Sequence, residues 1–337
     1  MKAFEFDHNL IDAYARFSRS FSTVRADDIV GEIKRQYDEG RFWPDALLSL
    51  NPRFLSGPTV DDLVVSGDLD EATAKIFRIG TTPIKFHRHQ AQSIAKARAG
   101  QSYVVTTGTG SGKSLCFFVP VVDAIVRARK AGRPRKTSAI IVYPMNALAN
   151  SQIKEIEKFI SQSGLPEDLK PVVRRYTGQE SQEERQRIAD NPPDILLTNF
   201  MMAELLLTRQ DALDTKVIDN ASGLEFIVLD ELHTYRGRQG ADVAILVRRL
   251  RNRCAPTKAP ICIGTSATMA SEGSEAGRAK AVADVASRLF GASIGPDAVI
   301  DESLQRATDD RLKLEDVRPQ IASALGNELP EVLTDEV

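Results

Sequence analysis

The sequence predicts an α/β fold in which a parallel β-sheet is covered by helices on both faces. From Pro83 to about Gly291, short apolar segments alternate with stretches of helical periodicity, which is typical of successive β-α-β units. A glycine-rich loop of the phosphate-binding type lies between the first apolar segment and the helical stretch after it. In such sheets ligands bind beyond the carboxyl ends of the strands, so the residues that follow the strands are the functional candidates.

Six segments have the length and composition of buried parallel strands, and helices are expected between them. The segments are Tyr103–Thr106, Ala139–Tyr143, Val172–Tyr176, Ile195–Thr198, Phe226–Leu229 and Ile261–Thr265. Residues 83–291 are therefore expected to form one nucleotide-binding domain. Residues 292–337 are acidic and moderately helical in pattern, which indicates a linker or the start of a further domain.

Residues 1–82 are expected to form a small helical accessory region. The apolar residues of Leu10–Phe17 have helical spacing, and Ile29, Ile33 and Tyr37 continue it in a second helix. The aromatic side chains of this region suit core packing better than stacking on nucleobases. They are Phe17, Phe21, Tyr37, Phe42 and Trp43.

The composition is that of a soluble globular chain, with 42% hydrophobic and 27% charged residues. The longest apolar run, Leu115–Val122, is far shorter than the roughly 18 residues that cross a membrane, so no membrane association is expected. Three scattered cysteines and no signal-peptide pattern favour the cytoplasm. The segment from Ser271 to Val337 has 14 acidic and 7 basic residues, so the rest of the chain carries −2 − (−7) = +5. A mildly basic body is compatible with nucleic-acid contact without indicating it strongly.

The glycine-rich loop fits the pattern G-x-x-x-x-G-K-[ST] between a strand and a helix. Its backbone N–H groups and the helix N-terminus would bind phosphate oxygens. Lys113 would reach the β- and γ-phosphates, and the Ser114 hydroxyl would hold Mg²⁺. The residues assigned to this nucleotide site are Thr107, Gly108, Thr109, Gly110, Ser111, Gly112, Lys113 and Ser114.

Two adjacent carboxylates, Asp230 and Glu231, follow the buried segment Phe226–Leu229. Such carboxylates are costly at the end of a buried strand unless they serve an ion or a proton. Asp230 would complete the Mg²⁺ shell opposite Ser114. Glu231 would orient and deprotonate the water that attacks the γ-phosphate. His233 is a candidate for coupling the nucleotide to neighbouring loops.

The combination of Thr-Gly-Thr-Gly-Ser-Gly-Lys-Ser (107–114) and Asp-Glu-Leu-His (230–233) resembles the first RecA-like motor domain of superfamily 2 DExH-box helicases. The resemblance covers Phe86 to Met269 and implies an ATP-dependent helicase or translocase. The segment from His233 to Arg253 resembles the large bacterial repair-type and phage-defence helicases in particular. ATP and Mg²⁺ are the implied ligands, and nucleic acid is the implied partner, with single-stranded DNA favoured over RNA.

Further segments match the family in its order. By resemblance, Gln90 would read the adenine edge and Phe86 would pack near the ring. Loops after three strands resemble those that hold the nucleic-acid backbone, where free N–H groups and small polar side chains suit phosphates. Their residues are Pro144, Asn146, Ala147, Thr177, Gly178, Thr198 and Asn199. Ser266 and Thr268 resemble the pair that links the ATP state to domain closure.

The arginines of the 248–253 segment allow two interpretations. Arg248, Arg249, Arg251 and Arg253 crowd one expected helix. They would form either a solvated or acid-paired face, or a contact with nucleic acid or a partner domain.

The family normally has a second motor domain whose arginines complete the ATP site, and no candidate for it occurs between Ala270 and Val337. We therefore expect a second motor domain in a longer chain or a partner protein, and weak activity of this chain alone, because an arginine finger contributes about 10³–10⁵ in rate. Two other classes stay open: a non-enzymatic scaffold that keeps the fold, and another phosphate-loop enzyme such as a GTPase. A guanine-reading Asn-Lys-x-Asp segment is absent from the sequence.

Overall fold

The computed structural model describes residues 3–20, 24–39, 41, 43, 53–108, 110–267 and 274–305, and the chain divides into two compact units at Pro52 and Arg53. The first unit contains two helices, α1 (Ala3–Arg19) and α2 (Asp27–Asp38), as expected for a helical accessory region. Within it the rings of Tyr14 and Trp43 pack edge to face at 5.1 Å. Phe21 and Phe42 of the expected aromatic set lie outside the described residues.

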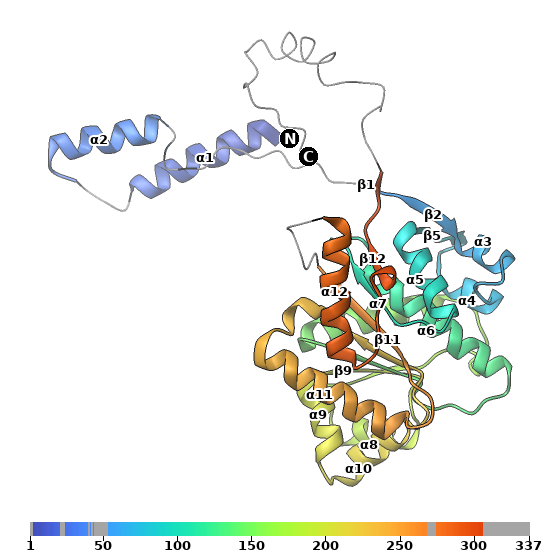
Figure 1. Ribbon diagram of the computed structural model, residues 1–337. Helices are drawn as coiled ribbons and strands as arrows, with labels where there is room; N and C mark the ends of the chain where they lie inside the picture. The colour runs from blue at the N-terminus through green and yellow to red at the C-terminus, as the bar shows by residue number, and fades with distance from the viewer. Residues whose placement is uncertain are drawn as a thin grey trace. The chain divides into compact units, whose positions relative to one another are not determined.

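The second unit is built on a seven-stranded parallel sheet with helices on both faces, as the sequence predicts (Figure 1). Its strand order is β12-β6-β11-β10-β7-β9-β8. The strands are β6 (Tyr103–Thr106), β7 (Ala139–Tyr143), β8 (Val173–Tyr176), β9 (Ile195–Asn199), β10 (Phe226–Leu229), β11 (Ile261–Ser266) and β12 (Val299–Asp301). All six expected strands are confirmed, with bounds that differ by at most one residue.

The seventh strand, β12, is not among the expected strands. It pairs with β6, with Asp301 opposite Thr106, so the sheet extends past the boundary drawn at residue 291. Short strands flank the sheet and pair with one another: β1 (Arg53–Phe54) with β13 (Leu304–Gln305), β2 (Ser56–Thr59) with β5 (Lys85–His87), and β3 (Arg78–Ile79) with β4 (Thr82–Pro83). Residues 53–82 thus belong to the compact unit that contains the sheet, and the extent of each domain stays a prediction.

Two groups of helices form from the amphipathic stretches between the strands (Figure 1). One group contains α3 (Val60–Val65), α4 (Glu71–Ile76), α5 (Arg88–Arg98), α6 (Lys113–Lys130) and α7 (Asn146–Gln162). The other contains α8 (Gln182–Asp190), α9 (Phe200–Thr208), α10 (Ala212–Asp219), α11 (Gly237–Cys254) and α12 (Glu275–Phe290). The 3₁₀ helices η1 (Leu232–Thr234) and η2 (Pro296–Ala298) complete the described elements.

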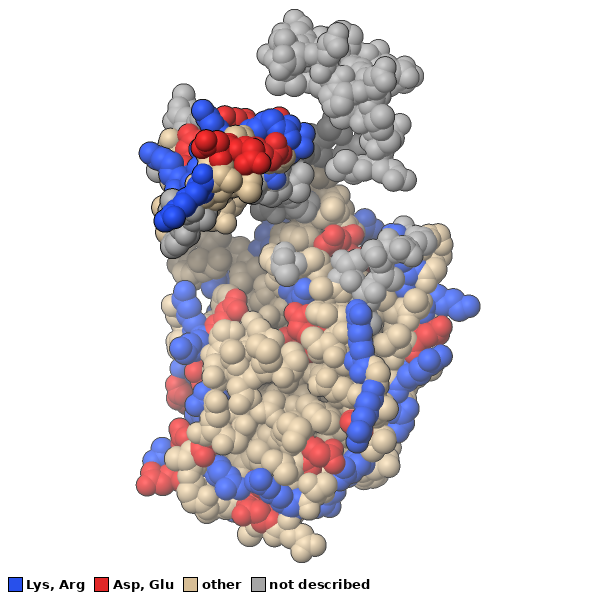
Figure 2. Space-filling model, turned by 90° about the vertical axis from the view of Figure 1, so that its left-hand side faces the viewer, with Lys and Arg blue, Asp and Glu red and all other residues tan. Residues whose placement is uncertain are grey.

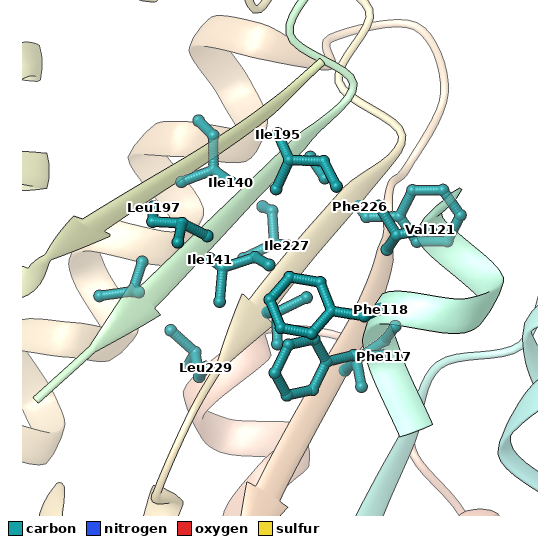
Figure 3. Packing of buried hydrophobic residues seen from close by; sticks show 14 of the residues in the cluster. Phe117, Phe118, Val121, Ile140, Ile141, Ile195, Leu197, Phe226, Ile227 and Leu229 are labelled. Carbon is teal, nitrogen blue, oxygen red and sulfur yellow. The ribbon is translucent and has the colours of Figure 1, made fainter. Parts of the chain in front are cut away.

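Part of the core lies between the sheet and α6, the helix that follows the phosphate loop (Figure 3). Phe117 and Phe118 extend from α6 toward sheet residues that include Ile227 and Leu229. Both phenylalanines are buried, and complete burial of such a side chain contributes about 1.5–3 kcal/mol. This packing fixes the start of α6, and with it the loop, relative to the carboxyl edge of the sheet.

No helix among the described residues is both long and apolar enough to cross a bilayer. On the face drawn in Figure 2, basic and acidic side chains lie intermixed around a broad uncharged area.

Candidate functional site

The phosphate loop connects β6 to α6 and is closed by a glycine with a left-handed backbone. Gly112 has φ +70°, and a Cβ at this position would lie 2.6 Å from Nε2 of Gln90. Glycine is therefore required both by the backbone conformation and by the close approach of Gln90. Thr109 of the assigned site lies outside the described residues.

The loop's polar groups bond to one another. Nζ of Lys113 donates to the carbonyl oxygens of Thr107 at 2.8 Å and Gly108 at 3.4 Å. The hydroxyls of Thr107 and Ser111 lie 2.6 Å apart, with both side chains buried. The ammonium group is thus folded onto its own loop, so a phosphate would have to draw it away from these carbonyls.

The acid pair lies at the same edge of the sheet as the loop. β6 and β10 flank β11 and are parallel to it, so their carboxyl ends are two strand spacings apart, about 10 Å. Burial raises the pKa of Asp230, and the positive charge of Lys113 acts in the opposite direction. The structure therefore brings Lys113 and Asp230 within electrostatic reach of each other.

A threonine on the intervening strand holds both acids. Thr265, at the carboxyl end of β11, donates its hydroxyl to Oδ1 of Asp230 and accepts the N–H of Glu231 at 3.2 Å. Glu231 has φ 54° and ψ 56°, in the left-handed region. Among the described residues other than glycine, it alone has a positive φ. Such a backbone conformation persists only where its surroundings fix it, and it occurs often at functional sites.

His233 connects the acid pair to the end of β11. Its Nδ1 lies 3.2 Å from Oε2 of Glu231 and 3.3 Å from Oγ of Ser266, and the N–H of Ala267 points to it at 3.4 Å. His233 and Ser266 are therefore in contact, as a coupling role requires. Thr268, the third residue of the expected coupling set, lies outside the described residues.

In the expected adenine-reading segment, Phe86 does not lie where it could pack against an adenine ring. This side chain is fully buried in the core because β5 directs it inward, so it has no surface to offer to an adenine ring. Gln90 is also buried: its Oε1 accepts the N–H of His87, and its Nε2 donates to the carbonyl of Gly112 at 3.0 Å. Gln90 thus supports the loop through the carbonyls of Ser111 and Gly112.

The aromatic side chains grouped around this part of the loop are ones that the sequence analysis missed. Phe54, His87 and His89 form a ring cluster with centroid separations of 5.3–5.6 Å. Nε2 of the buried His89 lies 3.0 Å from the carbonyl oxygen of Ser111, and burial lowers the pKa of His89. The sequence signal was the pair of histidines on either side of Arg88, directly before Gln90.

The loops assigned to nucleic acid are joined by one asparagine. Nδ2 of Asn199 donates to Oδ1 of Asn146 at 2.6 Å and to the carbonyl of Thr177 at 3.0 Å. Its Oδ1 accepts the N–H of Met202 and so caps α9. The structure thus brings the loops after β7, β8 and β9 together, with Pro144 partly exposed and Ala147 exposed beside them.

Three of these assigned residues already have partners within the chain. The N–H groups of Thr177 and Gly178, expected to be free for phosphate, both donate to Oε2 of Glu180, at 2.7 and 2.9 Å. The hydroxyl of Thr198 is buried and donates to the carbonyl of Tyr176 at 2.7 Å. Sequence reasoning could not show that a nearby carboxylate and a neighbouring strand already use these groups.

The arginines of α11 have partners within the chain. Arg248 and Arg251 donate to carbonyl oxygens at the end of α12, including Phe290 at 2.8 Å from Arg251. The other two pair with carboxylates: Arg249 with Glu204, and Arg253 with Asp219. The acid-paired interpretation is therefore the one that the structure supports, extended by contacts to the C-terminal carbonyls of a neighbouring helix.

A lysine-bearing loop and an acid pair at one edge of a helix-covered parallel sheet define a phosphate-loop nucleotide-binding domain. The chain belongs to the DEAD/DEAH box helicase family, whose pattern matches residues 87–276, more than half of its length. The motor domain expected from the sequence is thereby confirmed.

Two curated helicases illustrate the similarity. The chain is 32% identical over 187 residues to the uncharacterized ATP-dependent helicase YprA of Bacillus subtilis, and the match covers 55% of this chain and 23% of YprA. It is 30% identical over 176 residues to the ATP-dependent helicase HRQ1 of Saccharomyces cerevisiae, covering 50% and 15% of the two chains. The chain therefore matches about a quarter or less of the length of these relatives.

Two solved helicase structures have a fold similar to that of this chain. A DUF1998 helicase, MrfA bound to DNA, superposes with a TM-score of 0.58 at 27% identity, covering 75% of this chain and 29% of that one. The DEAD-box helicase Mss116, bound to ssRNA and UDP-BeF, has a TM-score of 0.57 at 17% identity over 76% of this chain and 47% of that one. This second likeness shows the RecA-like fold alone.

Proposed function

We propose that this chain is the ATP-hydrolysing motor domain of a helicase or translocase that moves on or unwinds nucleic acid. The observation that carries the proposal is the placement of Lys113, Asp230 and Glu231 at one edge of the sheet, two strands apart. Phosphate-loop enzymes need a cation and an acid pair on either side of the same triphosphate. The scaffold alternative predicts no need for these charged side chains, which are costly to keep in a partly buried environment.

The residues present suit ATP with Mg²⁺. Lys113 would leave the Thr107 and Gly108 carbonyls for the β- and γ-phosphates, and Ser114, at the start of α6, would contribute a metal ligand. Burial raises the pKa of Asp230, and a bound divalent cation would favour its ionised form. Glu231 would accept the proton of the attacking water, with Thr265 holding its backbone and His233 beside its carboxylate.

Single-stranded DNA is the proposed track, reached through the loops that Asn199 joins. Support comes from MrfA, described as bound to DNA, and from the Lhr helicase of Mycobacterium smegmatis, described as bound to ssDNA. Phosphate contact at Thr177 and Gly178 would require Glu180 to release their N–H groups. The three cysteines are free and buried, which supports a cytoplasmic location.

We further propose that a second motor domain, in a longer chain or a partner protein, completes the ATP site. The greater length of YprA and HRQ1 supports this proposal. On this basis the 337-residue chain alone should bind Mg·ATP, hydrolyse it slowly and separate no strands. Robust unwinding of a forked duplex by this chain alone would contradict it.

The test of the proposed function is a set of binding and ATPase measurements. Wild type should bind Mg·ATP in preference to Mg·GTP, and its ATPase rate should rise more with single-stranded DNA than with RNA of the same sequence. Lys113→Ala should lose nucleotide affinity, whereas Glu231→Gln should retain affinity and lose hydrolysis. Equal affinity for GTP would favour another class of phosphate-loop enzyme, and unaltered ATPase in Lys113→Ala would refute the site.

A further inference from the structure

The end of the described chain lies against the phosphate loop. β12 pairs with β6, and the residue after β12, Glu302, accepts the N–H of Gly108 on Oε2 at 2.8 Å. The approach is close: a Cβ on Gly108 would lie 3.3 Å from the same oxygen. The first glycine of the loop thus leaves space for a carboxylate, although its own backbone does not have a positive φ.

The segment that carries Glu302 is itself tied to the other side of the loop. The next residue, Ser303, accepts the N–H of Leu55 at 2.7 Å, and the carbonyl of Leu55 accepts the N–H of Arg88 at 2.9 Å. Arg88 begins α5, whose residues His89 and Gln90 contact the loop at Ser111 and Gly112. These hydrogen bonds therefore link both ends of the loop to Glu302 and Ser303.

We propose that Glu302 occupies the phosphate loop in the nucleotide-free protein and competes with the nucleotide for it. The inference rests on the proposed ATP site. A carboxylate on a loop N–H takes the position of an anion at groups that bind phosphate, and such charge-assisted bonds are among the stronger ones. Lys113 is at the same time bound to the Thr107 and Gly108 carbonyls, so two of the loop's anion-binding groups, Nζ of Lys113 and the N–H of Gly108, already have partners within the chain. A triphosphate brought to this loop would also meet the negative charge of Glu302.

The carboxylate has a place to withdraw to. Glu302 borders a cleft of about 640 Å³ between α5 and β12, whose lining includes Arg88 and Lys96 together with the carboxylates of Asp297 and Asp301. Lys96 pairs with Asp297 at 3.1 Å, so Arg88 is the basic side chain that a withdrawn Glu302 would approach. Because Glu302 directly follows β12, its withdrawal would link nucleotide binding to this edge strand of the sheet. Glu302 is thus a positioning residue that sets the resting state of the loop.

A purely structural role for Glu302 makes a different prediction. If the contact only braced the loop, its loss would lower both the stability of the protein and its affinity for nucleotide. Competition predicts opposite signs: the nucleotide-free protein becomes less stable, while its affinity for nucleotide rises. This difference in sign is what the experiment measures.

The experiment compares wild type with Glu302→Ala, Glu302→Gln and the control Asp297→Asn, all in the 337-residue chain. Asp297 carries the same charge near the same segment but pairs with Lys96 at 3.1 Å and is 79% exposed. Titration with Mg·ATP and Mg·ADP should show at least about tenfold tighter ATP binding in Glu302→Ala, consistent with loss of one bond to a charged group. Glu302→Gln should lie between Glu302→Ala and wild type, and Asp297→Asn should match wild type.

Two further readouts complete the test. ATP should gain more than ADP, because it carries more negative charge near Glu302, and the gain should shrink at high salt. The melting temperature of Glu302→Ala without nucleotide should fall, while its rise on adding Mg·ATP should exceed that of wild type. Unchanged or weaker ATP binding in a folded Glu302→Ala would overturn the proposal while leaving the ATP site intact. Failure of wild type and every variant to bind nucleotide would instead refute the proposed function.

Discussion

Replacing Thr265 with valine tests how the acid pair is held. Thr265 is fully buried, its hydroxyl donates to Oδ1 of Asp230, and its oxygen accepts the N–H of Glu231. Valine has a similar shape but no hydroxyl. The substitution therefore leaves a carboxylate oxygen of the partly buried Asp230 and a backbone N–H without these partners.

The expected loss follows from these two bonds. A bond to a charged group contributes about 1.5–3 kcal/mol and a neutral one about 1 kcal/mol, so Thr265→Val should lower the free energy of unfolding by about 2.5–4 kcal/mol. Because Asp230 and Glu231 lose their common anchor, kcat for ATP hydrolysis should fall at least tenfold, or about 1.4 kcal/mol in the barrier.

Thr73→Val is the matched control. Thr73 is also fully buried and donates to a buried carboxylate, Oδ1 of Asp123, at 2.9 Å, but it lies on α4 outside the candidate site. This variant should lose about 1.5–3 kcal/mol of stability and keep its ATPase rate. Urea unfolding and DNA-stimulated ATPase assays, both at a temperature where each variant is folded, make the comparison. The reasoning would be refuted if Thr265→Val hydrolysed ATP at the wild-type rate while losing about as much stability as Thr73→Val.

Three other substitutions have defined outcomes. Burial raises the pKa of Asp230, so the folded state keeps this proton to a higher pH than the unfolded chain, and stability is lost as pH rises from 3.8 through the raised pKa. Without nucleotide and Mg²⁺, the melting temperature of Asp230→Asn should therefore exceed that of wild type at pH 7, and this difference should vanish below pH 3.8. An equal or lower melting temperature at pH 7 would contradict this. Asn199→Asp keeps the cap on α9 but loses both donated bonds, so single-stranded DNA binding by fluorescence anisotropy should weaken about tenfold, and unchanged binding would show that these loops do not need Asn199. Arg251→Lys keeps the charge but loses the guanidinium bonds to the carbonyls of Phe290 and Gly291, so the free energy of unfolding should fall by about 1 kcal/mol while DNA affinity stays unchanged. A loss of DNA affinity without a loss of stability would favour the nucleic-acid interpretation of α11.

Local patterns predicted much of the fold and the centre of the site. Strands such as Ile195–Asn199 and Phe226–Leu229 are runs of apolar residues with clear ends, and buried parallel strands require such runs. The phosphate loop and the acid pair were recognisable because each follows a strand of this kind. β12 was missed because Val299–Asp301 is three residues long, so it has no apolar run to detect.

What the sequence could not supply is the partner of each polar group. Glu180 and Glu302 bond to loop N–H groups, and Arg251 bonds to carbonyls at the end of another helix. These pairings depend on how the elements pack, since residues 108 and 302 are distant in the chain. Phe86 shows the same limit, because its position next to the motif did not reveal that β5 directs it into the core.

The most direct test of the central claim is a crystal structure of the chain with Mg²⁺ and a non-hydrolysable ATP analogue. The account predicts that Nζ of Lys113 leaves the Thr107 carbonyl for the β- and γ-phosphates, with Asp230 and Glu231 facing the same triphosphate across β11. A nucleotide bound elsewhere, or bound to this loop with Asp230 and Glu231 turned away from its phosphates, would contradict it.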